Sequence, residues 1–177
     1  MKAITLWQPW ASLVACGAKI IETRSWPTSY RGPLAIHASK NIPKQVSELW
    51  KDDAQFRVNA RCKLDPVAVL SRMPIGLSDL PSGVIVATCE LTDCCIIGEP
   101  VEYDDQRECC RWAHYPLLDS LGIHVECVQI GSHELLFGDY TPGRYGWILA
   151  NIKLPDRPIP AVGKQGLWEW DMPEAAQ

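Results

Sequence analysis

A glycine placed between an apolar run and a strand-forming run constrains how this chain begins to fold. The residues before Gly17 predict a short strand, a proline-started turn and an amphipathic helix that begins near Pro9 or Ser12 and runs to Cys16. Gly17 is then the natural residue to end the helix, because glycine adopts the left-handed conformation without steric cost. β-Branched residues follow, so the chain is predicted to turn from the helix directly into an extended strand.

This predicted turn is followed by three ionisable residues close together in the sequence, Lys19, Glu22 and Arg24. Alternate side chains of a strand share a face, so Glu22 and Arg24 should project together, with Lys19 at the corner between helix and strand. Such a cluster rarely serves packing alone. The structural alternative is that Glu22 simply pairs with Lys19 or Arg24 and fastens this corner.

The rest of the chain predicts a mostly β domain of the α+β class. Short runs rich in β-branched and aromatic residues are separated by turns with glycine or proline, such as Thr141-Pro142-Gly143. The 177 residues suit a single domain, for which we predict a compact β-barrel with helices at its edges. Two parts depart from this pattern: a helical insertion at about 40–80 and a variable excursion at about 98–130, whose carboxylates we interpret as a solvated face.

Composition and charge narrow the classes of function. A net charge of −4 removes the long-range attraction used by non-specific nucleic-acid binders, so any contact with nucleic acid is expected to be local. The eight cysteines include the doublets Cys94-Cys95 and Cys109-Cys110 but no Cys-x-x-Cys spacing, so we expect reduced thiols, no metal and no cofactor. With no signal-like start and no membrane-spanning apolar run, we expect a cytoplasmic protein without a membrane partner.

Residues beside glycine-bounded turns add to the candidate site. Arg144 stands between two glycines and is followed by Tyr145 in a strand with an aromatic face. Lys164 lies in a second glycine-bounded turn, and Ser39 closes a predicted strand. These side chains are candidates for ligand contact.

Some tryptophan and histidine residues are predicted to lie in the core and others to contact a ligand. Trp10 and Trp26 stand beside polar turn residues and are candidate walls for a bound base. His37, alone in a predicted strand, is interpreted as a hydrogen-bonded core or rim residue. The tryptophans in apolar alternation, which we expect in the core, are Trp7, Trp50, Trp147 and Trp170.

Several separate motifs in the expected order resemble the ASCH domain family, whose fold resembles the PUA RNA-binding domain. The family motif Gly-x-Lys-x-x-Glu-x-Arg is present as Gly17, Lys19, Glu22 and Arg24. Segments that also resemble the bacterial and phage branch are Gln8-Pro9-Trp10-Ala11, Ser25-Trp26, Ile36-His37-Ala38-Ser39, Gly143-Arg144-Tyr145-Gly146-Trp147 and Gly163-Lys164-Gln165-Gly166-Leu167-Trp168. The resemblance covers both ends of the chain and implies a PUA-like barrel of five to six strands.

The same resemblance implies a nucleic-acid or nucleotide site beside the motif. The expected partner is RNA, another single-stranded nucleic acid or a modified nucleoside. Glu22 would accept a hydrogen bond from an exocyclic amine of the base. The expected phosphate contacts are Lys19, Arg24, Arg144 and Lys164, and the expected stacking faces are Trp10, Trp26 and Tyr145.

Two enzymatic alternatives stand beside recognition, and the first of them is what the resemblance implies. One bacterial branch hydrolyses the acetyl amide of N4-acetylcytidine with the motif lysine, a threonine three residues later and a distant glutamate. Lys19 matches that lysine, but Glu22 stands in place of the threonine. As an amidohydrolase without a metal, the protein would use Lys19 as base, nucleophile or oxyanion stabiliser and Glu22 to move the proton. As a ribonuclease, it could use His37 as a general acid or base.

Overall fold

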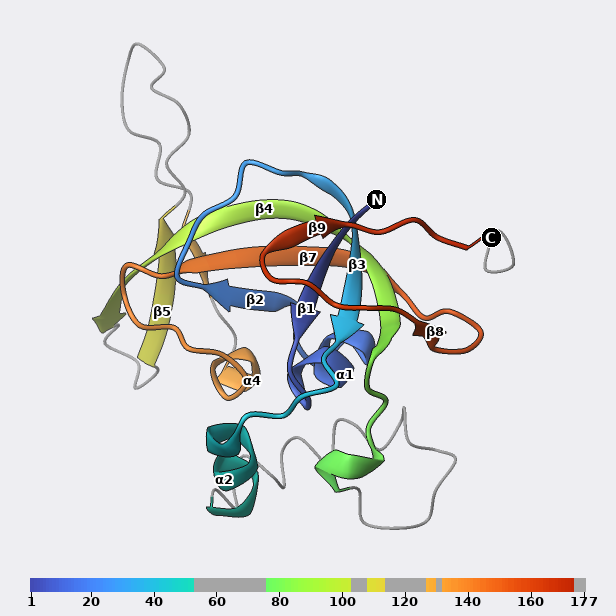
Figure 1. Ribbon diagram of the computed structural model, residues 1–177. Helices are drawn as coiled ribbons and strands as arrows, with labels where there is room; N and C mark the ends of the chain where they lie inside the picture. The colour runs from blue at the N-terminus through green and yellow to red at the C-terminus, as the bar shows by residue number, and fades with distance from the viewer. Residues whose placement is uncertain (53–75, 103–107, 114–126, 130–131, 174–177) are drawn as a thin grey trace. The chain divides into compact units, whose positions relative to one another are not determined.

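The computed structural model describes residues 1–52, 76–102, 108–113, 127–129 and 132–173, which are mostly strands (Figure 1). They divide into two compact units. The first unit contains residues 1–19, 33–90 and 151–177, and the second contains residues 20–32 and 91–150. Two long strands, β4 (Val84–Glu102) and β7 (Tyr145–Lys153), run from one unit into the other.

The first unit is built on a mixed sheet (Figure 1). Strand β1 (Lys2–Leu6) pairs in parallel with β3 (Gly32–Ala38) and antiparallel with β9 (Leu167–Glu169). The first part of β4 lies on the other side of β3 and pairs with the short strand β8 (Ile159–Pro160). The helices here are α1 (Trp10–Ala15), α2 (Lys44–Asp52) and a 3₁₀ turn (Leu77–Asp79).

Small residues of the sheet make room for aromatic rings in the core of this unit. Ala3, Ala35 and Ile85 form a buried cluster with Trp168 and Trp170. Buried apolar area of this kind is the main stabilising contribution to such a unit. The cluster therefore fixes β9 against β1 and β3.

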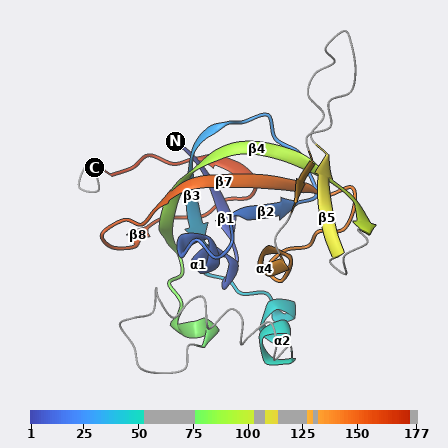
Figure 2. The same cartoon turned by 180° about the vertical axis from the view of Figure 1, so that it is seen from behind.

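In the second unit β2 (Ile21–Arg24) pairs antiparallel with β7, and β7 lies beside the second part of β4 (Figure 2). Strand β5 (Glu108–Ala113) pairs with the end of β4 and with β6 (Cys127–Gln129). A short helix, α4 (Ser132–Leu135), precedes β7. One core cluster of this unit consists of the buried residues Ile21, Cys95, Ile97 and Tyr140, with the partly buried Leu135 and Ile148 packed against it.

The helix end predicted at Gly17 is confirmed. Helix α1 is followed by Gly17 with φ +73°, where the Gly17 amide donates to the Val14 carbonyl at 2.9 Å and the Ala18 amide donates to the Leu13 carbonyl at 3.0 Å. These two bonds form a Schellman cap, which requires the left-handed conformation at the glycine. The chain then enters β2, as the sequence predicted.

The mostly β, α+β class is confirmed, with differences in detail. Strand β4 extends to Glu102, and β5 and β6 lie within the segment at 98–130 that we expected to be a surface excursion. Of the helical insertion expected at 40–80, the structure shows α2 and the 3₁₀ turn, and the remainder lies outside the described residues. No helix in the described part of the chain has both the length and the apolar character needed to cross a bilayer.

One tryptophan expected in the core lies outside it. Trp50, Trp147 and Trp170 are buried, but Trp7 is 50% exposed. Trp7 follows the end of β1, and Leu6 beside it points to the opposite face and is buried. Apolar alternation identified a strand here but not which face was covered, and the core assignment of Trp7 was wrong.

Candidate functional site

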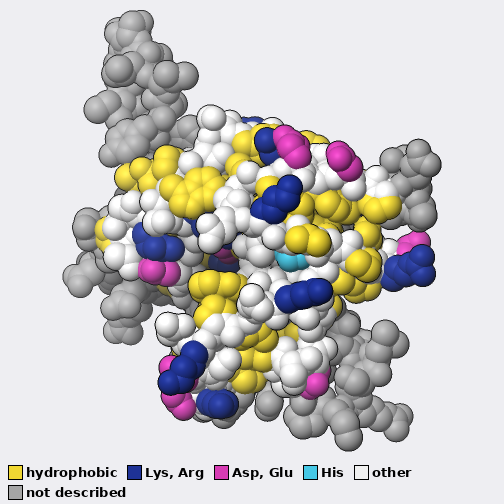
Figure 3. Space-filling model, in the orientation of Figure 1, with side chains coloured by type: hydrophobic (Ala, Val, Ile, Leu, Met, Phe, Trp, Pro, Cys, Tyr) yellow, Lys and Arg dark blue, Asp and Glu magenta, His cyan; other side chains and the backbone are white. Residues whose placement is uncertain are grey.

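Several basic side chains in the described part of the chain lie next to an acidic one. Figure 3 shows several Lys and Arg side chains next to Asp or Glu. Lys2 pairs with Glu169, and Arg31 pairs with Asp93 at 2.8 Å. A surface of this kind does not hold a nucleic acid by charge alone, so a binding site needs particular local groups.

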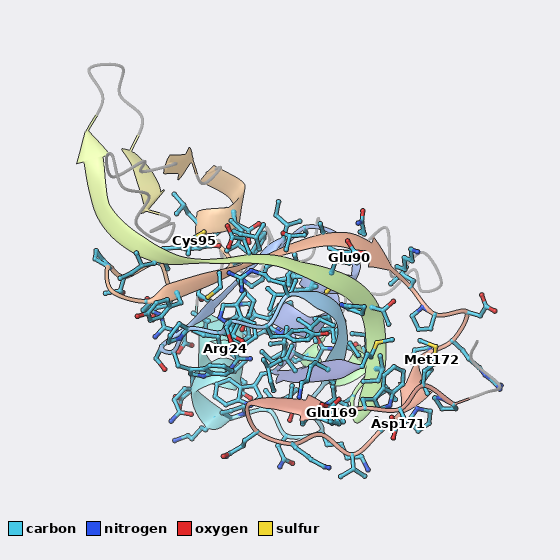
Figure 4. All side chains as sticks on the ribbon, turned by 90° about the horizontal axis from the view of Figure 1, so that it is seen from above. Arg24, Glu90, Cys95, Glu169, Asp171 and Met172 are labelled. Carbon is cyan, nitrogen blue, oxygen red and sulfur yellow. The ribbon has the colours of Figure 1, made fainter. Side chains whose placement is uncertain are left out.

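The motif residues Glu22 and Arg24 lie side by side on β2. Arg24 Nε is 3.1 Å from Glu22 Oε1, and the side chains are only 26% and 12% exposed, respectively (Arg24 is labelled in Figure 4). The predicted sharing of one face is therefore confirmed. A carboxylate and a guanidinium this far removed from water interact more strongly than an exposed pair.

The antiparallel partner of β2 brings aromatic residues to the same face. Glu22 is opposite Trp147 and Arg24 is opposite Tyr145 in the β2–β7 register. Directly opposed residues of antiparallel strands have side chains on the same face of the sheet. Trp26, two residues beyond Arg24, packs edge-to-face on Trp147 with ring centroids 4.7 Å apart. We call these five residues the β2–β7 face.

Trp147 contributes an unusual donor to this face. The ring is fully buried, and within the described residues its Nε1 has no hydrogen-bond partner. Buried N–H groups are nearly always paired, because leaving one unpaired costs roughly 1–3 kcal/mol. The β2–β7 face thus combines an acceptor on Glu22, donors on Arg24 and Trp147, and aromatic rings.

The start of β2 is held by Glu134 of α4, which the sequence analysis did not identify. Glu134 is 7% exposed, and its carboxylate accepts hydrogen bonds from the amides of Ile20 and Ile21 at 3.1 and 3.0 Å. The Tyr140 hydroxyl donates to the same carboxylate at 3.1 Å. The sequence signal was an acidic residue directly before the apolar run at 135–137, but nothing in it named a partner 114 residues away.

Arg144, a predicted phosphate contact, has its own acidic neighbour. Its Nε lies 3.3 Å from Asp139 Oδ2 and donates to the Asp139 carbonyl at 3.1 Å. Hydrogen bonds from Thr141, with a smaller effect of the Arg144 charge, hold the pKa of Asp139 below its usual value. Arg144 is thereby fixed at the turn that leads into β7.

The remaining predicted site residues belong to the first unit. Lys19 is 1% exposed, and its amide donates to the Leu13 carbonyl at 3.0 Å as part of the end of α1. Trp10 is half-buried in the first turn of α1. The Ser39 hydroxyl accepts from the Asn41 amide at 3.2 Å and so shapes the turn after β3.

Lys164 lies in an exposed loop fastened to β1. Its carbonyl accepts a hydrogen bond from the Thr5 hydroxyl at 2.8 Å, and its Nζ lies 5.9 Å from the centre of the Trp168 ring. The Trp168 indole donates to the Thr5 hydroxyl at 3.2 Å. Thr5 therefore links the loop to the buried face of β9.

His37 is a buried, hydrogen-bonded residue, as the sequence predicted. It is 2% exposed, and its Nε2 lies 3.2 Å from the Ala161 carbonyl, to which it donates in the tautomer protonated at that nitrogen. Burial lowers the pKa of His37, only partly offset by this hydrogen bond. The ring also lies edge-to-face against Trp168, with centroids 5.9 Å apart.

The nine predicted site residues therefore divide between the two units. Within the second unit the structure brings Glu22, Arg24, Trp26 and Tyr145 to one face and fixes Arg144 at the start of β7. In the first unit, the predicted residues are Lys19, Trp10, Ser39 and Lys164.

Known proteins show similarity over most of this chain. The family model of the ASCH domain matches residues 4–153. Human activating signal cointegrator 1 is 37% identical over 93 residues, which cover 51% of this chain and 14% of the human protein. Its mouse counterpart is 36% identical with the same coverage. The similarity thus spans only a small part of these longer relatives.

Proposed function

This chain belongs to the ASCH domain family, and from that premise we propose that it recognises RNA or a modified nucleoside through the β2–β7 face. The observation that carries the proposal is the largely buried ion pair of Glu22 and Arg24, set opposite Trp147 and Tyr145. Charged and aromatic groups in this combination are typical of sites for single nucleotides.

Each group on this face suits one part of a nucleotide. The guanidinium fork of Arg24 is suited to a phosphate or to the acceptor edge of a guanine. The Glu22 carboxylate accepts hydrogen bonds from the amino group of cytosine, adenine or guanine. Trp26 and Tyr145, which are half-buried, are the stacking candidates.

The overall charge predicts how such binding depends on salt. With a net charge of −4, the protein attracts polyanions only through local groups. Each phosphate neutralised on a single strand contributes a slope of about −0.7 in a plot of log affinity against log salt concentration. We therefore expect a shallow slope of roughly −1 to −2, as for a site that contacts two or three phosphates.

Recognition accounts for the geometry better than either enzymatic alternative. Glu22 forms an ion pair with Arg24, whose Nε lies 3.1 Å from Oε1, so the carboxylate acceptor is kept beside a cation. His37, the residue available to a ribonuclease, is 2% exposed and lies against the backbone of the 161–163 loop. Release of cytidine from N4-acetylcytidine by the purified protein would support the amidohydrolase instead.

The proposal is tested by anisotropy of a fluorescein-labelled single-stranded RNA of mixed sequence. Arg24→Gln should weaken binding by about tenfold, because a charge-assisted contact contributes ~1.4 kcal/mol or more. Arg31→Gln is the matched control, since Arg31 is also ion-paired in the second unit but with Asp93. Equal affinities of both variants and the unmodified protein would contradict the proposal.

A further inference from the structure

We infer that Glu134 is a positioning residue for the β2–β7 face, because it fixes the first residues of β2 and thereby the placement of Glu22 and Arg24. The inference rests on the proposed function because that function supplies the ligand of the β2–β7 face. The anchoring of β2 itself is a property of the protein without ligand and can be measured separately.

Glu134 uses both carboxylate oxygens for this purpose. Oε2 accepts from the Ile20 amide at 3.1 Å, and Oε1 accepts from the Ile21 amide at 3.0 Å and from the Tyr140 hydroxyl at 3.1 Å. The residue is 7% exposed, so water competes little for these bonds. Hydrogen bonds from N–H groups to a buried carboxylate are stronger than those between neutral groups.

Strand β2 needs such an anchor because it ends the row of strands. Among the described strands its neighbour is β7, to which it is joined through the Leu149 amide and the Ile20 carbonyl at 2.8 Å. Outward-facing N–H groups of an edge strand have no strand partner. Glu134 supplies acceptors to two successive amides just before Glu22.

A second link extends the anchor along the same strand. The Asp139 amide donates to the Thr23 hydroxyl at 3.1 Å, between Glu22 and Arg24 in the sequence. Asp139 also contacts Arg144 at the start of β7. The segment from Glu134 to Arg144 therefore holds β2 at two points and positions a further candidate phosphate contact.

The geometry gives Glu134 no direct part in ligand contact. Its oxygens already accept from three donors, and it lies against the apolar core that includes Ile21 and Tyr140. Glu134 acts through β2, which distinguishes it from Glu22. Its removal should alter ligand binding only by displacing Glu22 and Arg24.

Glu134→Gln tests this role, with Glu48→Gln as the matched control on the half-exposed surface of α2. Glutamine keeps one acceptor oxygen and turns the other into a donor, which would face the Ile20 or Ile21 amide. We expect at least about tenfold faster hydrogen exchange at one of these amides and about tenfold weaker RNA binding in a fully folded sample. Glu48→Gln should change neither quantity.

Three results separate the possibilities. If Arg24→Gln already abolishes the RNA contact, adding Glu134→Gln should cause little further loss of affinity, whereas equal losses in both backgrounds would overturn the positioning role. Unchanged exchange at Ile20 and Ile21 would overturn it as well. If Arg24→Gln leaves RNA binding intact, the proposed function fails while the exchange rates still test the anchor.

A milder variant covers the case in which Glu134→Gln does not fold. Tyr140→Phe removes one donor to Oε1 and leaves both amide bonds in place. It should change exchange at Ile21 in the same direction as, but less than, loss of the carboxylate. No change at Ile21 in this variant would count against the anchor.

Discussion

Replacing Gly163 by alanine should destabilise the protein through a clash with His37. A Cβ on Gly163 would lie against His37 Cε1, 2.5 Å from His37 Nδ1 and 2.9 Å from the Thr5 hydroxyl oxygen. The ring cannot swing aside at little cost, because it is 2% exposed, contacts the Ala161 carbonyl and lies against Trp168. Gly163 therefore has to be glycine for lack of space.

The expected loss of stability follows from the overlap. Non-bonded carbon atoms prefer separations of about 3.5–4.0 Å, so the added methyl overlaps the ring by about 1 Å. Overpacking of this kind costs typically ~1–3 kcal/mol. At ~2 kcal/mol, the midpoint of thermal unfolding should fall by about 4–8 °C for a chain of this length. The loop that carries Lys164 should shift with it.

Thermal unfolding followed by circular dichroism measures this effect in two backgrounds. In a His37→Ala protein the ring is absent, so Gly163→Ala should cost less by about 1–2 kcal/mol than it does beside histidine. Gly143→Ala is the control, because a Cβ there has nothing within 4 Å and its cost, from φ +86°, is conformational. A loss for Gly163→Ala that is independent of His37 would refute the steric explanation.

Three further predictions concern the folded state. Gly17→Ala should cost about 1 kcal/mol by denaturant unfolding, because a Cβ there meets no atom but the φ of +73° is unfavourable for alanine, and an unchanged midpoint would contradict this. Burial lowers the pKa of His37 from its usual 6.5, so the unfolded chain binds a proton more readily than the folded protein. The free energy of unfolding should therefore be full above about pH 6.5 and fall below it. In His37→Gln this fall should be less steep. Burial raises the pKa of Cys89 and Cys95 to about 12, so iodoacetamide at pH 8 should leave both unmodified until unfolding, as peptide mass spectrometry would show.

Short-range sequence patterns predicted β2, the strand that carries Glu22 and Arg24. Gly17 was recognised because a helix that ends in a tight turn needs a residue that accepts positive φ, and the cap has that geometry. Glu22 and Arg24 were placed on one face because strand alternation has a period of two. Both features depend on a few neighbouring residues.

Features that depend on distant contacts were not predicted. Glu134 binds amides 113 and 114 residues away, and no local pattern specifies that pairing. The apolar run around Trp7 indicated a strand but did not show which face would be covered. Strands β5 and β6 were missed because β6 pairs with β5 and β5 pairs with the far end of β4, in a segment rich in charged residues.

The most direct test of the proposed recognition face is a titration of ¹⁵N-labelled protein with a short single-stranded RNA, followed by NMR. The indole N–H of Trp147, assigned with a Trp147→Phe variant, is a suitable probe because it is buried beside Glu22 and Trp26 and has no partner in the described residues. We predict that this signal and the amides of Glu22 and Arg24 shift most on addition of RNA. Saturating RNA that leaves these signals unmoved while shifting those of the first unit would contradict it.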